Sequence, residues 1–216
     1  METGVVSIVA QHAESVLGKE RFRYMSAVVA NCKMLALELD GQEEEKGNDK
    51  PRQAIDLDAL IIAAYLHDIS TVAHGFNEHQ LESAEMAVEF LNGLNISAER
   101  VKKVEQAILA HTTAYASEER ESVPIEGRIL YDADKLGRLS GLAVVTSLIE
   151  FGARYPDRAV TGDVLVAILR HIEERFVELY QSLNTAPARE MAQLKFGNTL
   201  AFLDGVIEHL AESTPV

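Results

Sequence analysis

The sequence has a single cysteine, and its 20 Lys and Arg residues are outnumbered by 34 Asp and Glu. Because Cys32 stands alone, an intramolecular disulfide and a cysteine-based zinc site are both excluded. The net charge of −14, without any Lys/Arg cluster, disfavours binding of duplex nucleic acid, which needs a basic face to displace counterions. A small phosphorylated ligand needs only a few cations and remains compatible with this composition.

Long apolar segments are also absent. The least polar run, 139–149, is far shorter than the roughly 20 residues that a helix needs to cross a bilayer. Glu2 stands where a secretory signal would carry Lys or Arg, and polar residues soon interrupt the apolar stretch that follows. We therefore expect a soluble, cytoplasmic protein with no membrane partner.

What the sequence does contain is a helical pattern on the scale of one domain. Its 216 residues, 47% of them hydrophobic, are enough to bury a real core. Apolar residues recur at intervals of three and four, and the strict alternation of a half-buried strand is never sustained. We predict an all-α, single-domain bundle of about eight to ten helices over 1–216. Its core is expected at about 17–152, with the C-terminal helices of 161–211 packed on it.

The clearest predicted helix covers about 20–39. Its apolar stripe consists of Met25, Val28, Val29, Cys32, Leu35, Ala36 and Leu39. Gly41 is predicted to end this helix, and the charged stretch 42–52 is predicted to be a solvated loop, with an interdomain linker as the alternative. A second stripe begins after Asp56, the predicted N-cap, and one further turn leads to His67 and Asp68.

Six of the seven histidines fall into two groups, and the seventh, His74, is expected in a Gly-bearing loop. Three are expected on exposed helical positions: His12, His171 and His209. Another three extend or begin apolar stripes: His67 beside Asp68, His79 at the start of a helix, and His111 at the end of another. Burying an imidazole or a carboxylate is costly unless it has a partner. A shared metal ion is one such partner, and backbone carbonyls that satisfy core histidines are the alternative.

Two further carboxylates, Asp132 and Asp134, flank an alanine in an apolar helical stretch. A mixed set of imidazoles and carboxylates suits a divalent metal such as Mn, Fe, Ni, Co or Mg. A buried salt bridge or a helix cap is the alternative role for these aspartates.

The ordered set of His67-Asp68, the apolar helix ending in His111, and Asp134 followed by Lys135 resembles the HD-domain superfamily of metal-dependent phosphohydrolases. The resemblance covers about 17–210 and is closest to the stand-alone bacterial type. It implies an all-α fold in which an early His, the His-Asp pair and a late Asp hold a metal. Members with a second metal add histidines between these positions.

Carried over to this chain, the resemblance makes His67, Asp68 and Asp134 metal ligands, and His79 and His111 the additional ones. His74 competes with His79 for that place. Tyr24 falls where the family has its first His, and a phenol with a pKa near 10 is a poor ligand for most divalent metals. The site could therefore be weakened, open to water or inactive, or it could persist on Asp68, His79 and His111.

The resemblance implies hydrolysis of a small phosphorylated compound, most plausibly a nucleotide. The metal would acidify a water molecule, and Asp68 would hold that water or take its proton. Lys135 or Arg138 would neutralise the departing phosphate. The alternative is an HD-fold protein that Tyr24 has impaired as an enzyme and that binds a nucleotide or a protein partner as a sensor or adaptor. The apolar helix at 139–149 could also pack across a homodimer.

Overall fold

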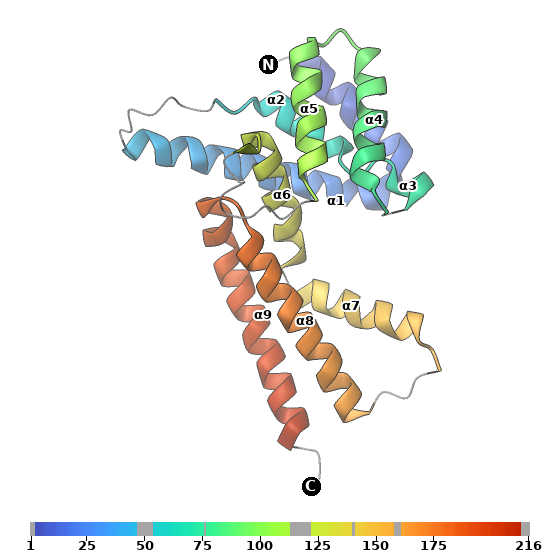
Figure 1. Ribbon diagram of the computed structural model, residues 1–216, viewed down its shortest axis with the longest axis vertical. Helices are drawn as coiled ribbons and strands as arrows, with labels where there is room; N and C mark the ends of the chain where they lie inside the picture. The colour runs from blue at the N-terminus through green and yellow to red at the C-terminus, as the bar shows by residue number, and fades with distance from the viewer. Residues whose placement is uncertain are drawn as a thin grey trace. The chain divides into compact units, whose positions relative to one another are not determined.

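The computed structural model describes residues 3–46, 54–75, 77–112, 122–139, 141–157 and 161–212. Within these ranges the chain forms nine α-helices and no strand (Figure 1). The helices are α1 (Thr3–Lys46), α2 (Leu57–Leu66), α3 (Thr71–His74), α4 (His79–Asn92), α5 (Ala98–Ala110), α6 (Ile125–Arg138), α7 (Gly141–Arg154), α8 (Gly162–Ser182) and α9 (Ala186–Glu212). The predicted all-α fold is confirmed.

The chain divides into two compact units, Met1–Asp134 and Lys135–Val216. The single domain expected from the sequence, with 161–211 packed on the core, stays a prediction. In the first unit, α2 packs against α1 and α5, and α4 packs against α5 (Figure 1). The predicted stripe of α1 is largely buried there, from Met25 through Ala36. Gly127 of α6 lies against α5, because a Cβ at this position would stand 2.9 Å from that of Ala110.

Helix α1 differs from its prediction at both ends. It starts at Thr3, is broken at Gly18 (φ 75°, ψ 164°) and continues through Gly41 to Lys46. The predicted helix end at Gly41 is therefore wrong. Gly41 takes a helical conformation, and the Gln, Glu and Lys residues that follow are good helix formers, so the chain has no local reason to stop there. Most of the predicted loop 42–52 lies outside the described residues.

Helix α2 has the N-cap that the sequence predicts. The Asp56 side chain accepts a hydrogen bond from the backbone N–H of Ala59 at 3.1 Å. Between Ala59 and Leu66, every residue except Tyr65 is buried, so this helix forms the centre of the first unit. Its last turn carries the chain directly into His67 and Asp68.

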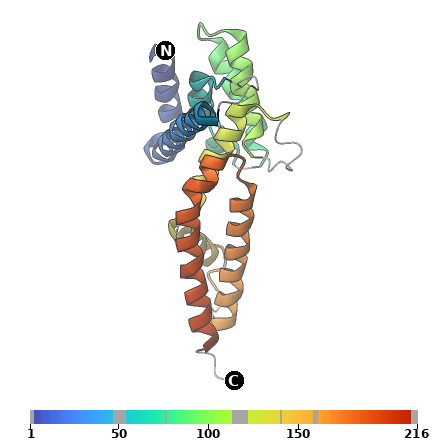
Figure 2. The same cartoon turned by 90° about the vertical axis from the view of Figure 1, so that its left-hand side faces the viewer.

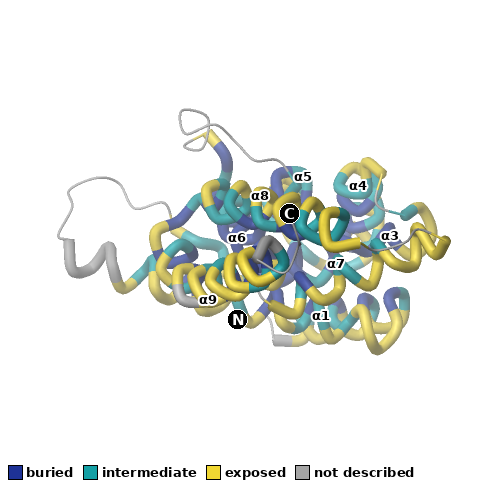
Figure 3. The backbone as a smooth tube through the Cα atoms, turned by 90° about the horizontal axis from the view of Figure 1, so that it is seen from below, coloured by how far each residue is buried: buried dark blue, intermediate teal, exposed yellow. Residues whose placement is uncertain are grey.

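The second unit contains α7, α8 and α9. Helices α8 and α9 run side by side in both views (Figures 1 and 2). The buried residues include Leu169, Ile172 and Phe176 of α8 and Leu203 of α9. Helix α7 contacts both of them, yet Val144 is its one buried residue, and the tube of α7 and α9 is exposed along much of its length (Figure 3). Among the described residues no single helix is long and apolar enough to span a membrane, although two bent helix pairs pass that test of length and composition.

Candidate metal centre

His67 and Asp68 lie directly after α2, in the turn that leads to α3. His67 is the C-cap of α2 and is fully buried, and Asp68 is 7% exposed. The turn is fixed by the backbone N–H of Thr71, which donates to the carbonyl of Asp68, and by the Thr71 hydroxyl, which donates to the same carbonyl at 2.7 Å. The apolar stripe of α2 thus delivers an adjacent imidazole and carboxylate into the interior of the first unit.

Two further histidines reach the same place from other helices. His79 is the first residue of α4, and His111 is the C-cap of α5. The Nε2 atoms of these two side chains lie 3.3 Å apart. They approach Oδ1 of Asp68 at 3.1 Å (His79) and 3.5 Å (His111), while Nε2 of His67 lies 3.7 Å from Oδ2 of the same carboxylate. Three helix ends therefore bring three imidazoles to one carboxylate.

Backbone hydrogen bonds fix which ring nitrogen of two histidines faces the carboxylate. Nδ1 of His67 lies 2.9 Å from the carbonyl of Ala64, and Nδ1 of His111 lies 2.5 Å from that of Ile108. A carbonyl only accepts, so each Nδ1 carries the proton and each neutral ring turns the Nε2 lone pair toward Asp68. This backbone support of the far nitrogen is the usual arrangement behind a metal-bound histidine.

The converging atoms fit a cation. Nε2 of His67 and Oδ1 of Asp68 are buried and have no hydrogen-bond partner within the part of the chain that the structure describes, which is costly for polar atoms. Ligand atoms of His67, Asp68 and His111 all lie within 4.8 Å of one another. Lone pairs and a carboxylate that face each other repel unless a positive charge lies between them, and an imidazole-carboxylate set suits a borderline or hard divalent ion.

The charge state of these groups is also the one that a metal needs. Burial and the charge of Asp134 raise the pKa of Asp68, but the neighbouring His111 and His67 imidazoles hold this pKa below its ordinary value. Burial lowers the pKa of His111. At neutral pH the site therefore presents an ionised carboxylate and a neutral imidazole, which are the ligand forms.

Asp134 stands at the side of this cluster, on α6. It is 1% exposed, and Tyr24 of α1 donates a hydrogen bond of 2.6 Å to its Oδ1. A second contact joins the same helices, where Asn31 donates to the carbonyl of Ala133 at 3.1 Å. Burial, together with the charges of Asp134 and Asp132, raises the pKa of the Cys32 thiol.

The structure thus places four of the predicted ligands together, namely His67, Asp68, His79 and His111. Their part in metal binding, like that of Asp134, stays a prediction. The alternative ligand, His74, is exposed and lies 3.7 Å from Glu82. Lys135 is buried and Arg138 exposed, and both belong to the second unit, so their catalytic roles also stay predictions.

Three histidines were expected at the surface. His171 and His209 are exposed, whereas His12 is half-buried and stacks on Phe90 with 3.8 Å between the ring centroids. The expectation for His12 is wrong because α1 extends further toward the N-terminus than its stripe indicates, so His12 lies beside α4.

One site contact was missed in the sequence. Arg21 donates to the hydroxyl of Thr71 at 3.1 Å, and so connects α1 with the turn that holds Asp68. The sequence places Arg21 on the same side of α1 as Tyr24, one turn earlier, but it gives no signal that Arg21 contacts Thr71.

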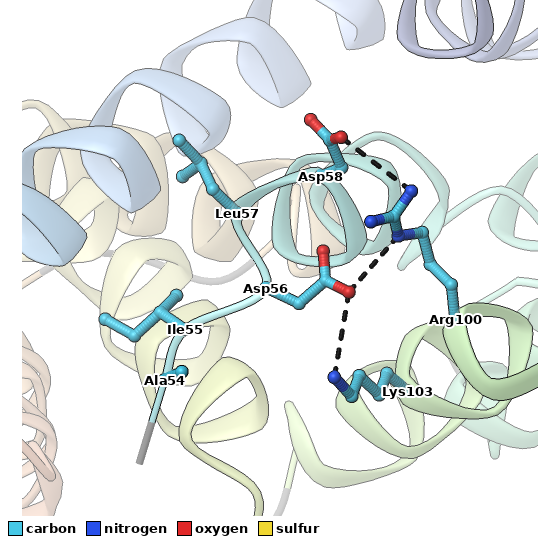
Figure 4. Close-up of a pocket in the computed structure, with 7 residues that line it drawn as sticks. All are labelled: Ala54, Ile55, Asp56, Leu57, Asp58, Arg100 and Lys103. Atoms are coloured by element: carbon cyan, nitrogen blue, oxygen red, sulfur yellow. Dashed lines mark hydrogen bonds and ion pairs between the residues drawn. The ribbon is translucent and has the colours of Figure 1, made fainter. Parts of the chain in front are cut away.

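A surface hollow of about 380 Å³ lies at the start of α2 (Figure 4). Its charged groups are paired with one another: Arg100 binds Asp56 at 3.2 Å and Asp58 at 3.8 Å, and Lys103 lies 3.7 Å from Asp56. These ion pairs connect α5 to the start of α2. Because the cations already have carboxylate partners, the hollow is a weaker candidate for a functional site than the buried histidine cluster.

Solved structures of other proteins share the fold of this chain. Crystal structures with the same fold include the Lin1889 protein from Listeria innocua (TM-score 0.65, 17% identity, 95% of this chain and 97% of that one). They also include Bacillus subtilis YpgQ in complex with ADP (TM-score 0.63, 20% identity, 97% and 95%) and a predicted HD superfamily hydrolase from an uncultured Thermotogales bacterium (TM-score 0.54, 21% identity, 97% and 92%).

A search of curated proteins found no match. The model of the HD domain matches residues 21–139, which is more than half of the chain and includes Tyr24, the four converging residues and Asp134. This chain therefore belongs to the HD domain family.

Proposed function

We propose that this protein is a metal-dependent phosphohydrolase that acts on a small phosphorylated compound. The observation that carries the proposal is the convergence of the Nε2 atoms of His79 and His111 on Oδ1 of Asp68, at 3.1 and 3.5 Å, in a buried cluster that includes His67. These residues would hold a divalent ion such as Mn, Fe, Ni, Co or Mg, with Asp134 as a further ligand. The ion would lower the pKa of water and polarise a phosphoryl oxygen.

The remaining chemistry falls to side chains of this chain. Asp68 is ionised at neutral pH, so its carboxylate can hold a water molecule or accept a proton from it. Lys135, which follows Asp134 directly, or Arg138 would neutralise the charge of the departing phosphate. We propose a nucleotide as the substrate, in keeping with the family resemblance and with the ADP in the complex of Bacillus subtilis YpgQ.

A second candidate function is favoured by Tyr24. We infer from the family resemblance that Tyr24 corresponds to the first histidine; its phenol donates to Asp134 and offers no nitrogen lone pair. An HD protein with this change would bind a nucleotide or a protein partner as a sensor or adaptor, without turnover.

Metal content and turnover separate the two functions. The protein is purified without chelator or metal-affinity resin, its metals are determined by elemental analysis, and phosphate release is followed over a panel of nucleotides and sugar phosphates. The hydrolase predicts bound metal and turnover that Asp68→Asn abolishes, with Asp58→Asn, at the start of the helix that precedes Asp68, as a matched control. Metal or nucleotide binding without turnover would favour the sensor, and the absence of both from natural protein and metal-supplemented protein would refute the hydrolase.

A further inference from the structure

Arg21 is an exposed cation tied to the turn that carries Asp68. Its guanidinium donates to the hydroxyl of Thr71 at 3.1 Å, and that hydroxyl in turn donates to the carbonyl of Asp68 at 2.7 Å. Thr71 is 5% exposed, so its end of this chain of hydrogen bonds is held inside the fold. Arg21 is therefore fixed two hydrogen bonds away from a residue of the metal centre.

One side of α1 makes two contacts with residues around the proposed metal centre. Tyr24, one helical turn after Arg21, donates to Asp134, whereas Arg21 reaches the Asp68 turn. These two residues therefore connect α1 to two proposed parts of the metal centre: Tyr24 contacts the Asp134 carboxylate, and Arg21 contacts the turn that carries Asp68. Arg21 thus belongs to the same unit as the cluster and contacts the turn that carries Asp68.

The charge of Arg21 has no carboxylate partner among the described residues. A guanidinium has five N–H donors, and its one hydrogen bond, to Thr71, leaves most of them for another acceptor. Arg100, by comparison, is held by two aspartates. In a chain of net charge −14, an arginine kept apart from carboxylates beside a buried imidazole-carboxylate cluster is suited to an anion.

We propose that Arg21 binds the phosphate group of the substrate, a role for which the sequence had suggested Lys135 or Arg138. The planar guanidinium can meet two phosphate oxygens at once, and its bond to Thr71 orients it for that contact. This assignment rests on the proposed phosphohydrolase function. The competing role is a brace, in which Arg21 only steadies the Asp68 turn.

Three variants distinguish these roles. Arg21→Ala removes the cation, Thr71→Val removes the tether but keeps the cation, and Arg23→Ala removes an exposed arginine two residues along α1, which points to another side of the helix. Binding of inorganic phosphate to Mn²⁺-loaded protein is measured by calorimetry, together with Mn²⁺ affinity, thermal unfolding and, where turnover is found, KM and kcat.

Phosphate binding by Arg21→Ala is expected to weaken by about tenfold to a hundredfold, with Mn²⁺ affinity unchanged, because a charge-assisted hydrogen-bond pair is lost. Thr71→Val should have a smaller effect and Arg23→Ala none. Equal losses in Arg21→Ala and Thr71→Val, or a loss of Mn²⁺ affinity in both, would identify the brace and overturn the proposal. No phosphate binding by the natural protein would also overturn it, whereas absence of turnover with phosphate binding intact would count against the hydrolase alone.

Discussion

The hydroxyl of Tyr24 donates a 2.6 Å hydrogen bond to Oδ1 of Asp134 and lies 3.3 Å from the carbonyl of the same residue. This contact joins α1 to α6 across 110 residues of sequence. It occupies one carboxylate oxygen of a residue that we propose as a metal ligand. A phenol supplies no imidazole nitrogen, so Tyr24 contributes a hydrogen bond at this place.

The first prediction concerns this substitution. We expect the natural protein to bind metal weakly at the position formed by His67, Asp68 and Asp134. Tyr24→His should raise the affinity for Mn²⁺ or Ni²⁺, because it supplies a neutral nitrogen ligand. We expect a gain of at least about tenfold, since even residues that only hydrogen-bond to metal ligands change metal affinity by that much. Titrations of the two proteins, alongside a panel of phosphatase substrates, measure this gain.

Tyr24→Phe is the control for the change from tyrosine. It removes the hydrogen bond to Asp134 without adding a ligand, so it should not reproduce the gain of the histidine variant. If the natural protein binds metal tightly and turns over substrate, and Tyr24→His gains nothing, another residue supplies the missing ligand and Tyr24 does not correspond to the first histidine of the family.

The second prediction concerns His111. If Asp68, His79 and His111 hold a metal that survives the change at Tyr24, His111→Ala should lower the bound metal by one equivalent while the helical circular dichroism is retained. His74→Ala is the matched control, because His74 is exposed and lies beside Glu82. A His111→Ala protein with its full metal content would make His111 a core histidine held by the Ile108 carbonyl.

Helix positions could be predicted from the sequence because burial imposes a regular spacing on apolar residues. The stripe from Met25 to Ala36 is buried as expected, and Asp56 caps α2 through a side-chain hydrogen bond, also as expected. Helix ends were less predictable. A glycine permits a helix break without requiring one: Gly18 takes a positive φ and breaks α1, whereas α1 continues through Gly41.

Some residues of the candidate site could be predicted from the sequence and others could not. His67, Asp68 and His111 follow from the ends of apolar stripes, because a stripe continued by one turn still points inward. The choice of His79 over His74 could not be made, since it depends on where α3 ends and α4 begins. The Arg21–Thr71 contact spans 50 residues and joins two polar side chains, and no periodicity in the sequence reports such a pair.

The third prediction concerns the pH dependence of stability at Asp56. Burial raises the pKa of this carboxyl, but hydrogen bonds from Ala59 and Arg100 and the charges of Arg100 and Lys103 bring it below the ordinary 3.8. A depressed folded-state pKa stabilises the fold above the unfolded-state pKa, and this contribution is lost as the pH falls through the folded value. Asp56→Asn should therefore lower the free energy of unfolding by about 1 kcal/mol at pH 7 and by less near pH 3.

Urea unfolding of both proteins at the two pH values tests this expectation. Asp58→Asn is the control, since Asp58 contacts Arg100 only at 3.8 Å and should change stability by less than about 0.5 kcal/mol. A deficit of the same size at both pH values would mean that the shape of the Asp56 side chain, and not its charge, stabilises the start of α2.

The last prediction uses the two glycines of α1. Gly18 has φ 75° and ψ 164°, a conformation that side chains rarely adopt, although nothing lies within 4 Å of a Cβ there. Gly18→Ala should therefore destabilise the protein by about 1–3 kcal/mol through backbone strain alone. Gly41 is helical and equally open, so Gly41→Ala should stabilise by up to about 1 kcal/mol. Thermal and urea unfolding of both variants measure the contrast, and a stable Gly18→Ala protein would show that α1 can run straight through residue 18.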